Sequence, residues 1–233
     1  MPPSITPSSR FRPRAVWIGA LLVLLLPGCA GWRPFQKWER AAKDKEKYGP
    51  TADARIKDLA ARSKAAKAGT SERQLEFTQE LAGTMLQEHD PRVRVKILQT
   101  AADYDTAAAT AICKGALQDP NDQVRIAACD VWAKRGGDEA VALLASRFQN
   151  DQDHDVRLRA LRMLGALKDK DAIPVLARAL EDADPAVQYR AVASLKEVSG
   201  RDLGNDVNAW RAWAADPSTA PEWSIAEQFR RLF

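Results

Sequence analysis

The stretch Asp90-Pro91-Arg92-Val93-Arg94 decides how this chain folds, because related stretches follow it at nearly equal intervals. Its valine returns at spacings of 31, 32 and 31 residues, as Val124, Val156 and Val187. Three residues before each valine stands an Asp or Asn, whose side chain accepts hydrogen bonds from the free amides of a first helical turn. We therefore expect a helix to begin after each of these caps, which are Asp90, Asn121, Asp153 and Asp184.

Apolar residues follow each valine at offsets of four, five and eight residues, which form one stripe on a helix. They are Ile97, Leu98, Ala101; Ala128, Cys129, Trp132; Ala160, Leu161, Leu164; and Ala191, Val192, Leu195. A further amphipathic segment precedes three of the caps, at 112–117, 141–148 and 173–180. A helix pair cannot bury its own stripe, but stacked pairs share a core. The period predicts an all-α fold: a short α-solenoid of about four stacked antiparallel helix pairs over residues 71–199.

The repeated turn resembles HEAT repeats, and within them the short PBS-lyase-like class, in which Asp-Pro-x-Val-Arg joins the two helices. Residues 90–94 match fully, 184–188 lack the Arg, 153–157 lack the Pro, and 121–125 keep the cap, Val and Arg. The resemblance implies a scaffold that binds a protein partner. A lyase-like enzyme or chromophore-binding protein is the first alternative, because lyases use the same repeats, and a purely structural envelope assembly factor is the second.

Residues 1–28 have the three zones of a secretory signal: a basic start, an apolar run over 15–26, and the small residue Gly28 before Cys29. The run would extend about 18 Å as a helix, too short to cross a bilayer. Leu26-Pro27-Gly28-Cys29 resembles the lipobox of bacterial lipoproteins, apart from Pro27. The resemblance implies lipidation at Cys29 and an envelope location, at the periplasmic face or the outer membrane. A signal peptide with an incidental cysteine is the alternative.

Residues 29–70 are expected to form the lipid anchor and a basic arm, with eleven Lys or Arg against five Asp or Glu. Aromatic residues at 32, 35 and 38 could lie at a membrane surface or pack on the body. The segment 51–68 is rich in Ala, Lys and Arg and is interpreted as a solvated helix or spacer. Residues 200–233 are expected to cap the solenoid, with Trp210 and Trp213 covering its last apolar stripe.

Charge disfavours nucleic acid as a partner. The chain has a net charge of +4, but residues 1–28 and 30–70 carry the excess of cations. The body that follows is therefore acidic, which is the wrong sign for a phosphate backbone.

No residue pattern indicates catalysis, a cofactor or a metal, so we expect the protein not to be an enzyme. His89 and His154 fall at turns of different repeats without ligand spacing to a cysteine or carboxylate. Cys113 and Cys129 fall on apolar positions, which favours buried thiols. A disulfide between them stays open as an alternative, since an exported protein enters an oxidising compartment.

The polar positions that follow each repeated valine are the candidate partner-binding residues. If the second helices of the pairs line one side of the solenoid, these positions form a row, made by Arg94, Arg125, Arg157 and Gln188. Such a row could face an acidic partner. Alternatively, each Arg braces its own turn by bonding an Asp or carbonyls of an adjacent repeat. Mutations separate the two readings, since loss of a brace lowers the melting temperature.

Overall fold

A computed structural model describes residues 39, 42–44, 46–47 and 49–216. The chain divides into two compact units, Met1–Gly49 and Pro50–Phe233. In the first unit, the described residues before Gly49 are helical. The predicted signal peptide, the predicted lipidation site Cys29 and the chain beyond Asp216 lie outside the described residues.

The second unit is all-helical over its described part, residues 50–216, as the repeat predicted. Its elements are α2 (Ala52–Lys67), α3 (Ser71–Gln87), α4 (Pro91–Ala101), α5 (Ala107–Ala116), α6 (Asp122–Arg135), α7 (Asp138–Asn150), α8 (His154–Leu167), η1 (Lys170–Ala172), α9 (Ile173–Ala179), α10 (Pro185–Ser199) and α11 (Val207–Ala215). None of the described helices is long and apolar enough to span a bilayer.

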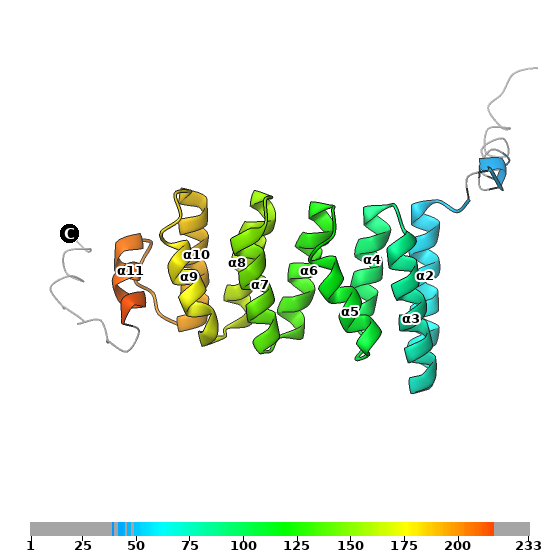
Figure 1. The fold of residues 1–233 in the computed structure, drawn as a ribbon, viewed down its shortest axis with the longest axis horizontal. Helices are drawn as coiled ribbons and strands as arrows, with labels where there is room; N and C mark the ends of the chain where they lie inside the picture. Colours follow the sequence, from blue (N-terminus) through cyan, green and yellow to red (C-terminus); the bar gives the residue numbers. More distant parts are fainter. Residues whose placement is uncertain (1–38, 40–41, 45, 48, 217–233) are drawn as a thin grey trace, which may run out of the picture. The chain divides into compact units, whose positions relative to one another are not determined.

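The helices are stacked as pairs in two layers (Figure 1). The first helices of the pairs are α3, α5, α7 and α9, and the second helices are α4, α6, α8 and α10. Each second helix packs on the second helix of the next pair. Among the first helices, α3 packs on α5, whereas α5, α7 and α9 hardly contact one another. The second helices therefore form the more closely packed layer of the solenoid.

Each second helix begins at the cap that the sequence predicted. The side chains of Asp90, Asn121, Asp153 and Asp184 all accept hydrogen bonds from amides of the following turn. Proline occupies the first turn of α4 and of α10, where its missing N–H removes no helical hydrogen bond. The starts of the second helices are thus determined locally.

The predicted stripes form the core that runs through the stack. Leu98, Cys129, Leu161 and Val192 occupy the same position in successive second helices, and all four are buried. One cluster of buried side chains extends from Leu98 to Trp213, and a second cluster, which includes Phe77, Ile97 and Ala101, lies at the end of the stack formed by α2 to α5. Cys113 and Cys129 belong to the first cluster as buried free thiols, so the structure has no disulfide between them.

The packing of helix α2 shows that the boundary between arm and repeats, expected at residue 70, was placed too late in the sequence. The segment is helical, but it is not a solvated spacer, because Ala52, Leu59 and Ala66 are buried against α3 and α4. It packs on α4 as α4 packs on α6, so α2 is a fifth member of the second-helix layer. Its few apolar residues suffice because α2 closes the end of the stack and needs to bury only one side.

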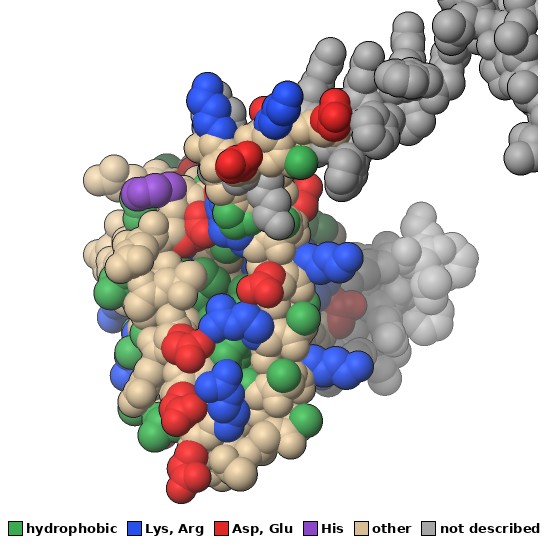
Figure 2. Space-filling view, turned by 90° about the vertical axis from the view of Figure 1, so that its right-hand side faces the viewer, with side chains coloured by type: hydrophobic (Ala, Val, Ile, Leu, Met, Phe, Trp, Pro, Cys, Tyr) green, Lys and Arg blue, Asp and Glu red, His purple; other side chains and the backbone are tan. Residues whose placement is uncertain are grey.

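The outer side of the α2–α3 end is polar. Figure 2 shows this end, over which charged side chains of both signs are spread with small groups of hydrophobic side chains between them. Arg62 of α2 pairs with Glu80 of α3, and Arg73 pairs with Glu76 at 3.1 Å. A solenoid needs such a polar terminal face to stay soluble.

The other end is closed by α11, as the tryptophans predicted. Trp210 is fully buried and its indole N–H donates to the carbonyl of Gly204 at 3.0 Å. Trp213 packs edge-on against Trp210, with ring centroids 5.5 Å apart. Both belong to the core cluster and α11 contacts α9 and α10, so the indoles cover the last apolar stripe.

Candidate functional site

The candidate residues Arg94, Arg125 and Arg157 lie along the turns that join the two helices of each pair. Each side chain reaches an acid of the next repeat, 25 or 26 residues further along the chain. That acid stands two residues before the next helix cap, where its carboxylate also accepts the backbone N–H of the cap residue. The structure therefore links consecutive turns through an arginine, a carboxylate and a cap amide.

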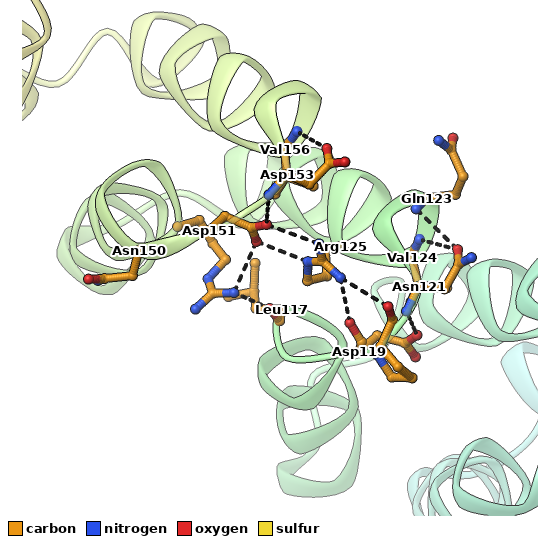
Figure 3. Close-up of polar contacts among 12 residues, drawn as sticks. Leu117, Asp119, Asn121, Gln123, Val124, Arg125, Asn150, Asp151, Asp153 and Val156 are labelled. Atoms are coloured by element: carbon orange, nitrogen blue, oxygen red, sulfur yellow. Dashed lines mark hydrogen bonds and ion pairs between the residues drawn. The ribbon is translucent and has the colours of Figure 1, made fainter. Parts of the chain in front are cut away.

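The link between Arg125 and Asp151 is the most buried of these (Figure 3). The guanidinium donates to both carboxylate oxygens of Asp151, each at 2.9 Å, while its Nη1 donates to the carbonyl of Asp119. Arg147 of α7 makes a second contact with Asp151 at 3.2 Å and donates to the carbonyl of Leu117. The side chain of Asp151 is 2% exposed, so it depends on these donors in place of water.

The same arrangement recurs on both sides. Arg94 donates to both carboxylate oxygens of Asp119, each at 2.8 Å. Arg157 contacts Asp182 at 2.6 Å, and this pair is more exposed than the others. The side-chain amide of the fourth candidate, Gln188, donates to the carbonyl of Asp182 at 2.7 Å and so braces its own turn.

A fourth ion pair in this row was missed from the sequence. Arg55 of α2 donates to both carboxylate oxygens of Glu88, at 3.0 and 3.1 Å, and its Nη1 donates to the carbonyl of Pro50. Arg55 stands four residues after the cap Thr51, as Arg94 does after Asp90. Arg55 was missed because it lies 39 residues before Arg94, a longer interval than the repeat period, and follows a Thr cap in place of Asp or Asn. The acidic residue two positions before each later cap, which includes Glu88, is the sequence signal that could have predicted this pair.

The charges stabilise one another electrostatically. Burial disfavours ionised Asp151, but the hydrogen bonds from Arg125 and the cap amide, with the charges of Arg125 and Arg147, hold its pKa below the ordinary value of 3.8. The pKa of Asp182 is lowered, first by the amide of Asp184 and then by Arg157. The pKa of Arg94 and that of Arg125 are raised by their hydrogen bonds to Asp119 and Asp151.

These contacts agree with the bracing interpretation of the arginine row. The side chains of Arg94 and Arg125 are 12% and 14% exposed, and most of their N–H groups are already bonded within the protein. Direct binding of an acidic partner by these residues would have to break those bonds. Their role in partner binding stays a prediction.

The cavities found on the described surface are open to solvent. One of about 290 Å³ lies over the Arg125–Asp151 pair and is lined by Gln118, Asn150 and Gln152 among others. Another, of about 780 Å³, lies at the turn before α4 beside His89. His154 is 3.4 Å from Asp184 at another turn, so the histidines do not meet. Within the described residues, no three side chains of His, Cys, Asp or Glu are arranged to hold a metal.

Comparison with known proteins agrees with the repeat geometry. The family model for HEAT repeats matches residues 78–160 and 146–209, which together extend from within α3 to the start of α11. No curated protein matches the chain. The matched region covers more than half of the sequence and coincides with the helix pairs, so the chain belongs to the HEAT-repeat family.

Proposed function

We propose that this protein is a scaffold that binds another protein through its HEAT repeats. The observation that carries the proposal is the continuous layer of five second helices, α2, α4, α6, α8 and α10, braced at every turn. A surface held in register by ion pairs loses little conformational freedom when a partner binds. HEAT repeats commonly mediate protein interactions, which supports the same function.

A catalytic function has less support. The described residues that could serve as acids or bases at the turns, such as Asp119 and Asp151, are held in ion pairs with arginines. Enzymes need concave pockets with a few convergent polar groups, whereas the cavities here are open to solvent. We therefore propose a binding role without chemistry.

We also propose that lipidation of Cys29 tethers the scaffold to an envelope membrane. The support comes from the sequence, in which a basic start and an apolar run precede Gly28-Cys29. Each buried CH₂ of an acyl chain contributes about 0.8 kcal/mol, so two or three chains hold a protein at a bilayer. Labelled palmitate should be incorporated by the unaltered chain and not by Cys29→Ser; equal incorporation would refute the tether.

Chemical cross-linking in the native cells tests the scaffold. The full chain should be recovered with one or a few proteins at a constant ratio. The variant Leu161→Ala with Leu164→Ala, which opens a cavity in the buried core, should lose them because it disturbs the stack. Recovery of no cross-linked protein, or of the same proteins with the disturbed variant, would contradict the proposal.

A further inference from the structure

We infer that the outer face of the second-helix layer binds a protein segment in which acidic residues stand beside apolar ones. The inference rests on the proposed scaffold function and specifies its surface and its partner. Three observations carry it: the charge of the second helices, a row of apolar residues across them, and a groove between α2 and α4.

Charge is divided unequally between the two layers. The five second helices, α2, α4, α6, α8 and α10, contain sixteen Lys or Arg and six Asp or Glu. The first helices, α3, α5, α7 and α9, contain four and five. The second layer is thus strongly basic on a body that is acidic beyond residue 70.

Part of this charge is used inside the protein, by the braced arginines and by pairs such as Arg159 with Asp130 at 2.5 Å. Another part has no partner among the described residues. Six cationic side chains of the second helices make no ion pair or hydrogen bond with other described residues: Lys57, Lys64, Lys96, Lys134, Arg162 and Arg190. They occupy the helix positions turned away from the core stripe. Their field attracts an acidic partner.

An apolar row runs through these cations. The residue two positions after each repeated valine, and the matching residue of α2, is apolar in all five helices: Ile56, Val95, Ile126, Leu158 and Tyr189. The first four are partly buried against the core clusters, and Tyr189 is 61% exposed. Neighbouring packed helices lie about 8 to 10 Å apart, so the row extends about 32 to 40 Å. A segment of about 10 to 12 extended residues spans that length.

The surface is hollowed between α2 and α4. A groove of about 310 Å³ there is lined by Ala60, Ser63, Lys64, Lys96 and Gln99, among others. Lys67 at the same groove already pairs with Asp103, at 2.6 Å. The ammonium groups of Lys64 and Lys96 pair with no other described residue, so they are available to pair with the carboxylates of a partner.

A protein segment fits this face better than a lipid or a nucleic acid does. Four of the five apolar side chains are partly buried between helices, whereas insertion into a bilayer needs side chains that stand out from the surface. Tyr189 is the one aromatic residue of the row, whereas single-stranded nucleic acids stack on several. An apolar strip flanked by charged residues is typical of protein interfaces, in which complementary charges steer the encounter.

The experiment uses the full chain in its native cells with photoreactive benzoylphenylalanine at position 189, in the second-helix layer. The control places it at position 86 in α3, where Leu86 is 89% exposed. We expect adducts from position 189 and not from 86. The attached peptide should contain more Asp and Glu than Lys and Arg, with apolar residues among them. Adducts confined to position 86 would overturn the inference and leave the scaffold intact; no adduct and no cross-linked protein would overturn both.

Charge reversal provides the second measurement. Arg162→Glu with Arg190→Glu should reduce the adduct yield at position 189 at least tenfold. The melting temperature should stay within 2 °C of the unaltered chain, because neither side chain pairs with another of the described residues. Arg178→Glu makes one such charge reversal on the exposed surface of α9 and should leave the yield within twofold. If the reversal lowers stability, Arg162→Gln replaces it. Adducts to lipid or nucleic acid, a basic attached peptide, or an unchanged yield would overturn the inference.

Discussion

Removal of one arginine tests whether the ladder of ion pairs braces the stack. In Arg125→Ala, Asp151 would lose a donor to both of its oxygens, while its side chain is 2% exposed. Breaking a buried pair costs about 3 to 5 kcal/mol. Arg147 remains 3.2 Å from Asp151 and still balances part of its buried negative charge. We therefore expect Arg125→Ala to lower the free energy of unfolding by about 3 kcal/mol, the lower end of that range.

This loss should be visible in thermal unfolding. For a domain of this size, 1 kcal/mol shifts the melting temperature by about 2 to 4 °C, so Arg125→Ala should melt about 6 to 12 °C lower. Arg157→Ala should have a smaller effect, about 1 kcal/mol, because solvent reaches both Arg157 and Asp182. Arg162→Ala is the control, because Arg162 is exposed and pairs with no other described residue, and it should change stability by less than about 0.5 kcal/mol.

The pH dependence identifies the carboxylate involved. The folded pKa of Asp151 is below its unfolded value, so its contribution to stability is complete above about pH 4 and is lost as the pH falls through the folded pKa. The difference in the free energy of unfolding between Arg125→Ala and the unaltered chain should be constant from about pH 8 to 5 and should shrink below about pH 4. A melting temperature within 1 °C of the unaltered chain at pH 7, together with lost partner capture, would refute the brace.

Other changes test the packing. A Cβ at Gly165 would lie 2.7 Å from the Cβ of Ser194, so Gly165→Ala should lower the free energy of unfolding by about 1 to 3 kcal/mol, measured by chemical denaturation. Gly83 faces open space, so Gly83→Ala should not lower it. Equal effects of the two changes would contradict the close approach of α8 and α10. Leu161→Ala should cost about 2 to 5 kcal/mol, because the side chain is fully buried, and a cost well below 1 kcal/mol would show that the stripe is misplaced. Burial raises the pKa of Cys129 to about 12, so iodoacetamide at pH 8 should label it in denaturant and not in the folded protein; rapid labelling of the folded protein would indicate that α6 opens.

Much of the fold followed from local chemistry that is written in the sequence. A cap residue, a proline in the first turn and an apolar stripe act within one helix, so Asp90, Pro91 and Leu98 reveal their roles without any knowledge of their neighbours. The recurrence of these signals in register then predicted the stack, since isolated pairs cannot bury their stripes. The indoles of Trp210 and Trp213 indicated the closing helix for the same reason.

Other features were decided by the tertiary structure, because they depend on residues that are distant in the sequence. The partner of Arg125 is Asp151, 26 residues away, and that of Arg55 is Glu88, 33 residues away. The weakly apolar α2 joins the second-helix layer because α4 offers it a surface, which its own composition could not reveal. The sequence determined where each helix begins and which side it buries, whereas stacking determined which charges pair and which remain free to meet a partner.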